Sequence, residues 1–268
     1  QRDPDGDGLS NYQELIIHET DPNDADTDGD GFSDGLEISE ASNPNESENF
    51  PTRLIAVTGS DNGTVTGSGS FALGSSTNLE AIANPGFIFG EWSGDAFGSQ
   101  NPLPVVADSN LLIGAVFIRD QRDPDEDGLS NYQELIIHET DPNDADTDGD
   151  GFNDGVEIAE ASNPNESENF PTRTVSLDES PNGVVTGTGI FPLGSSTSLQ
   201  ATPNPGYIFA EWSGDAIGFQ NPLPVVADSN LSITALFTQD QRDPDGDGLS
   251  NYQELIIHET NPNDADTD

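Results

Sequence analysis

Five segments of this chain repeat one twelve-residue pattern, in which aspartates fill the first, third and fifth places, glycine the sixth and glutamate the twelfth. The segments begin at Asp3, Asp26, Asp123, Asp146 and Asp243. This spacing predicts a tight loop that aims alternate side chains inward. A sixth segment begins at Asp266 and stops with the sequence at Asp268, so we expect the sequence to be a piece of a longer protein.

The pattern has the spacing of an EF-hand-type loop, and its residue types suit Ca²⁺, a hard cation that takes roughly six to eight oxygen ligands. Three aspartates supply one side of the shell, and the glycine allows the sharp turn. The seventh residue offers its backbone carbonyl, the ninth binds directly or through water, and the glutamate closes the shell with both oxygens. The predicted ligands are Asp3, Asp5, Asp7, Leu9, Asn11, Glu14, Asp26, Asp28, Asp30, Phe32, Asp34, Glu37, Asp123, Asp125, Asp127, Leu129, Asn131, Glu134, Asp146, Asp148, Asp150, Phe152, Asp154, Glu157, Asp243, Asp245, Asp247, Leu249, Asn251 and Glu254.

A simpler interpretation is that Asp and Gly are good turn residues and that an acidic surface is merely solvated. Five matches on a fixed period argue against this interpretation, and the sequence predicts two or more Ca²⁺ ions in every 120 residues. Whether a third ion binds near Asp21, Asn23 and Asp24 stays open. Asn261 replaces Asp21 in the third copy, so this position is not an essential charged ligand.

The formal net charge of the chain is -45, from 51 acidic and 6 basic residues, and this makes nucleic acid and anionic membranes poor partners. Residues 1–50 carry 15 Asp and Glu, whereas residues 51–120 carry 6. The uneven distribution favours local cation sites, because adaptation to high salt, which stays a minor alternative, is expected to place acids in both segments. The absence of cysteine excludes a disulfide framework and zinc thiolate sites.

Charge repulsion makes the ion part of the predicted fold. Two like charges about 4 Å apart repel by roughly 4 kcal/mol at an effective dielectric near 20. Several such pairs in each loop rival the roughly 5 to 15 kcal/mol that stabilises a typical domain. We therefore expect calcium to be needed for folding of the loops.

The string Gln-Arg-Asp-Pro recurs at Gln1, Gln121 and Gln241, which defines two full repeats of 120 residues and the start of a third. Residues 1–50 differ from residues 121–170 at 4 positions, none of them a predicted side-chain ligand, whereas residues 51–120 differ from their copy at 24. The predicted domains are calcium-binding modules at 1–50 and 121–170, β domains at 51–120 and 171–240, and a truncated module at 241–268.

Each module reads as two loops and two short helices. The first helix follows the first loop, with Tyr12, Leu15 and Ile16 on one side, and the second follows the second loop. The apolar residues expected to form a core are Leu9, Tyr12, Leu15, Ile16, Phe32, Leu36 and Ile38. This core is too small to stabilise about fifty residues, so bound metal must supply the remainder.

The other half of each repeat reads as strands. In the segment Leu111–Phe117 and its copy, the differences fall on alternate residues, which predicts that Leu111, Ile113, Ala115 and Phe117 face a core. In residues 76–83 the same comparison predicts that Leu79 and Ala81 face the core. Gly, Pro and Asn clusters separate the strands. The predicted fold class is a tandem array of small, mostly antiparallel β domains alternating with calcium-loop and short-helix modules, elongated as a whole.

The acidic half, with its repeated DxDxDG and TDPND strings, resembles the bacterial thrombospondin type 3 repeat, a family that places calcium loops along secreted and surface proteins as rigid spacers. The other half, with its GSS, NPGF and EWSGD strings, resembles the divergent internalin-B-type repeat of bacterial surface proteins. This second resemblance implies a β-grasp-like fold and an extracellular stalk or adhesin, and it brings no catalytic residues.

Two other residue types are candidate sites. Trp92 and Trp212 could stack on a sugar, although core packing is the simpler interpretation for the one tryptophan of each domain. His18 and its copies stand at a helix end, where the helix dipole favours them, and no nucleophile pairs with them. The chain is therefore predicted not to be an enzyme.

The sequence favours a structural function: an extracellular or cell-surface stalk, adhesin shaft or surface fibre, stiffened by calcium, whose partners are neighbouring repeats of the same chain. Self-association into fibres is a further step with weaker support. The alternatives are adhesin modules that bind a glycan or a surface receptor, or a spacer within a larger secreted enzyme. Neither nucleic acid binding nor membrane insertion is expected.

Overall fold

The computed structural model describes residues 2–266, and the chain divides into two compact units. The first unit comprises Gln1–Pro124 and Leu129–Pro142, and the second comprises Asp125–Gly128 and Asn143–Asp268. Of the predicted sixth loop, all but Asp266 lies outside the described residues.

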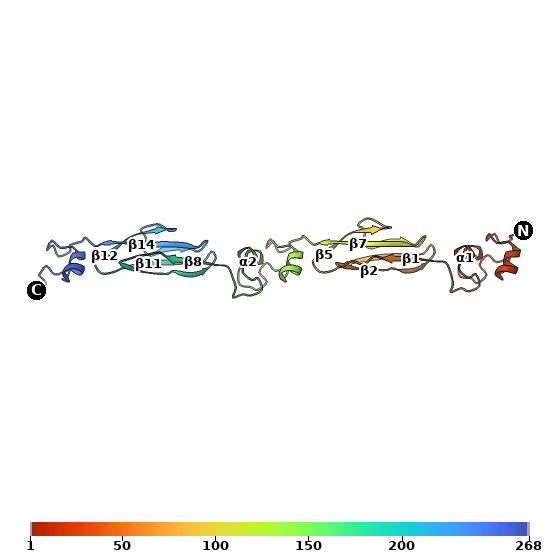
Figure 1. Ribbon diagram of the computed structural model, residues 1–268, viewed down its shortest axis with the longest axis horizontal. Helices are drawn as coiled ribbons and strands as arrows, with labels where there is room; N and C mark the ends of the chain where they lie inside the picture. The colour runs from red at the N-terminus through yellow and green to blue at the C-terminus, as the bar shows by residue number, and fades with distance from the viewer. Residues whose placement is uncertain (1, 267–268) are drawn as a thin grey trace. The chain divides into compact units, whose positions relative to one another are not determined.

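The first unit contains a β domain of seven strands (Figure 1). The strands are β1 (Thr52–Val57), β2 (Gly63–Thr66), β3 (Gly69–Ala72), β4 (Ser76–Ala83), β5 (Phe87–Gly94), β6 (Leu103–Val106) and β7 (Leu111–Arg119). One sheet has the order β3-β1-β7-β5 and the other β2-β4-β6. The first and last strands, β1 and β7, are parallel in the middle of the larger sheet, and every other pair is antiparallel.

The core of this domain collects side chains from both sheets. Ile113, Ala115 and Phe117 of β7 are buried, whereas Leu112 and Val116 on the other face are exposed. Leu79 and Ala81 of β4 are buried in the same cluster. The predicted inward faces of both strands are confirmed, because alternate side chains of a strand point to opposite sides.

Trp92 belongs to this core. Its side chain is 1% exposed, its ring lies 5.1 Å from that of Phe89, and its indole N–H donates to the carbonyl of Gln100. Trp212 is equally buried and donates to the carbonyl of Gln220. Core packing, not an open stacking platform, is therefore the role of both tryptophans.

The second unit repeats this architecture. Its strands are β8 (Thr172–Leu177), β9 (Gly183–Thr186), β10 (Gly189–Pro192), β11 (Ser196–Pro203), β12 (Tyr207–Gly214), β13 (Leu223–Val226) and β14 (Leu231–Gln239). The sheet orders are β10-β8-β14-β12 and β13-β11-β9. The two domains confirm the prediction of small, mostly antiparallel β domains that alternate with short-helix modules.

The acidic segments contain short helices separated by loops. A π-type helix recurs as η1 (Gln13–His18), η2 (Gln133–His138) and η3 (Gln253–His258), and α-helices follow as α1 (Asp34–Glu40) and α2 (Asp154–Glu160). Ser10 precedes η1, and its backbone amide and hydroxyl both donate to the side chain of Gln13, the first residue of the helix, which fixes the helix start. No helix among the described residues is long and apolar enough to cross a membrane.

The apolar side of η1 does not join a core of its own module. Tyr12, Leu15 and Ile16 are 66%, 57% and 66% exposed, so their predicted core role is wrong. Of the expected core residues, Leu9 alone is fully buried, and Phe32 stacks on Phe50. The interior of the module is instead occupied by Glu14, Asp34 and Glu37, each with no exposed surface. These acids, rather than apolar groups, dominate the module's buried side chains.

One turn in the second copy is strained. Glu126 adopts a left-handed backbone conformation with φ of 63°, whereas the same place in the other copies holds Gly6 and Gly246 at φ of 79° and 77°. A non-glycine residue there costs about 1 kcal/mol, because its Cβ approaches the following carbonyl.

We predict that Glu126→Gly raises the melting temperature of the module in saturating calcium by about 4 °C, as measured by calorimetry. Glu126→Gln removes the charge but keeps the strain, so this control should melt with the parent chain. Equal stabilisation by both substitutions would show that charge, not backbone strain, is responsible.

Candidate metal centres

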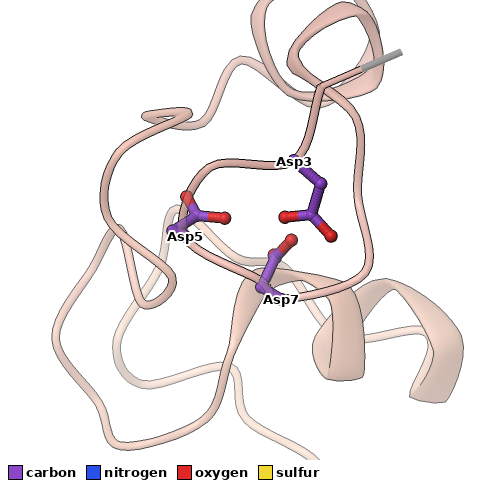
Figure 2. Close-up of side chains that lie close together, drawn as sticks. All are labelled: Asp3, Asp5 and Asp7. Atoms are coloured by element: carbon purple, nitrogen blue, oxygen red, sulfur yellow. The ribbon is translucent and has the colours of Figure 1, made fainter.

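The three aspartates of the first loop gather at one point. Asp3, Asp5 and Asp7 each offer a carboxylate oxygen, and these oxygens lie within 4.8 Å of one another (Figure 2). The carboxylates point toward a common space inside the loop. Such a convergence of acid oxygens is the arrangement that a calcium ion requires.

Backbone donors hold the loop in this form. The amides of Gly6 and Gly8 donate to the two oxygens of Asp3 at 2.8 and 3.2 Å, and the amide of Leu9 donates to Asp7 at 2.8 Å. Gly8, the sixth residue of the loop, has a φ of 97°, a conformation that glycine adopts without strain. The glycine of the motif is therefore placed where the turn needs it.

The second loop has the same construction. Oxygens of Asp26, Asp28 and Asp30 lie within 4.8 Å of one another. The amides of Gly29 and Gly31 both donate to Asp26 at 2.9 Å. Two separate acid clusters therefore lie in the first module.

Several buried oxygens in these clusters accept no hydrogen bond. In residues 2–50 they are both oxygens of Asp5, Oδ1 of Asn11, both oxygens of Glu14, Oγ1 of Thr20, Oδ2 of Asp28, Oδ2 of Asp30 and Oε2 of Glu37. A buried polar atom without a partner is costly, and a buried carboxylate is more so. A cation held by these oxygens would remove both costs, so the residues fit the predicted group.

Burial and neighbouring charges disfavour ionisation of the glutamates that end the loops. Burial raises the pKa of Glu14, and the charges of Asp5, Asp7, Asp3 and Asp34 raise it further. Burial and the charge of Asp30 raise the pKa of Glu37 to about 7, although Ser42 donates to this carboxylate. Without a cation, both glutamates therefore resist ionisation.

Asp34 lies between the two clusters. Its carboxylate accepts from the backbone amide and the hydroxyl of Thr27, at 2.9 and 2.7 Å. Its charge contributes to the raised pKa of Glu14 in the first loop and to those of Asp28 and Glu37 in the second, after burial as the main cause in each case. Sequence spacing assigned Asp34 to the second loop, whereas the structure brings it close to both.

A close backbone approach joins the two loops. The amide of Gly35 donates to Oδ2 of Asp7 at 2.8 Å, and a Cβ on Gly35 would collide with the carbonyl oxygen of Asp7. Gly155 makes the same contact with Asp127 in the second unit. Glycine at this position therefore lets the helix of the second loop lie against the first loop.

The other copies follow the same construction. Asp146, Asp148 and Asp150 converge within 4.8 Å in the second unit, and Glu157 there has no exposed surface and a pKa raised to about 7, mainly by burial. In the third copy the amides of Gly246 and Gly248 donate to Asp243.

The loop from Asp123 to Glu134 contains the division between the two units, so its ligand set stays a prediction. The carbonyl ligands predicted at Leu9, Phe32 and their copies also stay predictions. Asp21 and Asp24 are exposed, and the question of a third ion beside them stays open.

A residue outside the motif touches a predicted ligand. Asp120 follows the last strand of the first β domain, and its carboxylate accepts from the side-chain amide of Asn131 at 2.9 Å. The Oδ1 of Asn131 is buried without a hydrogen bond. The guanidinium of Arg122 holds the pKa of Asp120 far below its usual range, so Asp120 stays ionised. Asp240 and Asn251 repeat this contact at 2.8 Å.

Sequence reasoning missed Asp120, Gly35 and the double position of Asp34. The recurrence of Arg two residues after Asp120 and Asp240 was the available signal for the first. Nothing in the spacing of the second loop marked the other two, because their roles arise from the first loop. Gly35 donates to Asp7, 28 residues away in the chain, and the charge of Asp34 acts on Glu14.

Comparison with protein families identifies both halves of the repeat. The model of the divergent InlB B-repeat domain matches residues 53–121 and 173–241, about half of the chain. The chain belongs to this family. The model of the bacterial TSP3 repeat matches residues 3–25, 26–47, 123–145, 146–167 and 243–265. Both predicted resemblances are confirmed, and both models describe repeat units.

No curated protein matches the chain. Among solved structures, a similar chain is titled "Biofilm associated protein - BSP domain", with 16% identity and a TM-score of 0.17. The match covers 50% of the present chain and 25% of the solved one, so the present chain spans about a quarter of its length.

The raised pKa values predict a pH dependence. In the cation-free protein, folded Glu37 and Glu157 keep protons that the unfolded chain loses between pH values of about 4.5 and 7. Stability of the cation-free modules should therefore fall as pH rises through this window. Calcium binding should expel these protons at about pH 6 but not at about pH 8. Calorimetric titrations in buffers of different ionisation enthalpy measure the release, and equal release at both pH values would contradict the prediction.

The contact between loops predicts that Gly35→Ala weakens calcium binding at both loops of its module by about tenfold, because the loops must separate to admit the methyl group. Calorimetric titration of the whole chain measures the affinity. Gly59→Ala is the matched control, since a Cβ on Gly59 meets nothing within 4 Å. An effect confined to the second loop would show that the two loops bind independently.

Proposed function

We propose that this chain is a calcium-stiffened spacer of an extracellular or cell-surface bacterial protein, a segment of a stalk, adhesin shaft or surface fibre. The observation that carries the proposal is the module interior, where Glu14, Asp34 and Glu37 are fully buried. Buried carboxylates oppose folding unless a cation neutralises them. The confirmed family assignments support the same conclusion, since both families are repeat units.

Within a module, two sets of residues would each hold one ion. Asp3, Asp5, Asp7, Asn11 and Glu14 would hold one ion, and the equivalent residues from Asp26 to Glu37 a second. Calcium would supply positive charge that offsets the repulsion among these oxygens. The backbone donors already fix the aspartates, so binding would chiefly order the glutamates and the helices that carry them.

The β domains would act as spacers that need no metal. Each has its own apolar core, and its strands pair within the domain. An ion pair of 2.8 Å between Arg53 and Glu40 joins the first module to the β domain that follows it. Alternation of a metal-dependent module with a metal-independent domain would let calcium control the stiffness of the connections without unfolding the whole chain.

A second candidate function is ligand binding by the β domains, either to a glycan or to a surface protein. The supporting observation is an open hollow of about 480 Å³ in the second β domain, lined in part by Trp212, Ile217 and Phe219. These two side chains are 77% and 78% exposed. A further alternative is a spacer that carries the catalytic domain of a larger secreted enzyme.

The test is small-angle scattering of the chain in millimolar calcium and in excess chelator. Stiff connections in calcium should give way to an expanded, flexible chain on chelation, because the unneutralised acids repel one another. An unchanged profile would contradict the spacer proposal and would favour the binding function of the β domains.

Matched variants make this test specific. Glu134→Gln with Glu157→Gln removes two buried acids from the second module and should abolish most of the calcium response there. Glu166→Gln with Glu168→Gln makes the same charge change at exposed positions of that module and should leave the response intact. Equal effects would indicate general charge screening rather than bound ions.

A further inference from the structure

The exposed apolar side of η1 is the starting observation. Tyr12, Leu15 and Ile16 form it, at 66%, 57% and 66% exposure. Three large apolar side chains together on the surface of an otherwise acidic module are unusual, and they indicate a surface that another group covers.

The same residues in the second copy are covered by the β domain that precedes them in the first unit. The Tyr132 ring packs edge-on against Phe87, with centroids 5.4 Å apart, and Arg119 lies 4.4 Å from its centroid. Ile136 approaches Gly86 so closely that a Cβ there would lie 2.7 Å from its Cγ1. A glycine followed by an aromatic residue therefore makes the contact.

The second unit repeats the contact independently. Tyr252 packs edge-on against Tyr207 at 5.4 Å, and Ile256 lies against Gly206. In both units the residue that ends the β domain bridges the two parts, since the amide of Asp240 donates to Gly206 and the amide of Tyr252 donates to Asp240.

The exposed fractions of the helix side chains differ between the first and second copies as this contact predicts. Leu135 and Ile136 are 38% and 46% exposed, about 20 percentage points less than Leu15 and Ile16. The next residue does not change, because Ile17 is 55% exposed and Ile137 56%. The difference between copies is thus confined to the side that the β domain covers.

We propose that Tyr12, Leu15 and Ile16 form a docking surface for a β domain of this same family, joined on the N-terminal side of Gln1. The turn Asn-Pro-Gly, followed by Phe or Tyr, would be the docking element. A second copy of this chain does not fit the role, because both such turns, at Gly86 and Gly206, are already covered by η2 and η3.

Docking has a consequence for the first loop. In the later copies Asp120 and Asp240 accept hydrogen bonds from the side-chain amides of Asn131 and Asn251, whose Oδ1 atoms, like that of Asn11, are buried without a hydrogen bond. An aspartate at the end of the docked domain would hold Asn11 in the same way. Asp120 and its copies are therefore positioning residues for the ninth place of the loop, and the domain would raise the calcium affinity of the loop that follows it.

The test adds a copy of residues 51–120 directly before Gln1 of the whole chain. The tyrosines are replaced biosynthetically by 3-fluorotyrosine, and fluorine NMR in saturating calcium reports the exposure of each ring to a neutral nitroxide. Assignment by Tyr→Phe substitution resolves Tyr12 from its copies, since the chain has 4 tyrosines. The extension should reduce relaxation of the Tyr12 signal to the level of Tyr132.

Two controls fix the interpretation. The extension carrying Phe87→Ser should leave Tyr12 exposed, and the extension carrying Asp120→Asn should still cover Tyr12 but should not raise the calcium affinity of the first loop. A Tyr12 signal that the parent extension leaves unchanged overturns the proposal. Coverage of Tyr12 in the unextended chain, appearing with rising protein concentration, would overturn it in favour of self-association.

This proposal and the calcium spacer proposal can fail separately. The docking measurement depends on a folded module, and calcium-dependent spectra of Tyr132 report folding in the same sample. Loss of any calcium effect on Tyr132 would count against the spacer function. An intact calcium effect with an unchanged Tyr12 would count against the docking surface alone.

Discussion

Repulsion among buried carboxylates is the interaction on which the modules depend. Glu14, Asp34 and Glu37 have no exposed surface, and each lies near further acids of the loops. The module has almost no apolar interior to offset this repulsion, since Leu9 and Pro44 are its only buried apolar side chains among residues 2–50. The acids that oppose folding of the free chain are the groups that would hold a cation, so folding and binding become one process.

The β domains differ from the modules in what fills their interior, which is apolar rather than acidic. Ile55, Leu79 and Ile113 are completely buried in an apolar cluster, so burial of apolar surface stabilises these domains. Each β domain contacts the helix that follows it, so the apolar domain and the acidic module touch directly. Asp120 belongs to the domain, yet it holds the side chain of Asn131 in the loop. Under the proposed function, a calcium-dependent change in a module would therefore reach the β domain that precedes it.

Sequence reasoning predicted what depends on local spacing. The period of two in β7 placed Ile113 and Phe117 in the core, and the loop pattern brought Asp3, Asp5 and Asp7 together. It failed where a neighbour decides: Tyr12 and Tyr132 have the same local sequence, but only Tyr132 is covered by a β domain in the described structure. Asp34 was assigned to one loop because a linear pattern does not show that Gly35 lies against Asp7.

The central claim is that at about pH 7.5 the modules fold only with a bound divalent cation, whereas the β domains fold without one. Hydrogen exchange of the whole chain at about pH 7.5, followed by mass spectrometry, tests it directly. Peptides from two copies of a module can have the same sequence, but no module peptide has the sequence of a β-domain peptide, so the two kinds of domain are distinguished. Chelation should remove protection from peptides containing Glu14 or Glu37 and leave those containing Ile55 or Ile113 protected. Module peptides that stay protected in excess chelator would contradict the account.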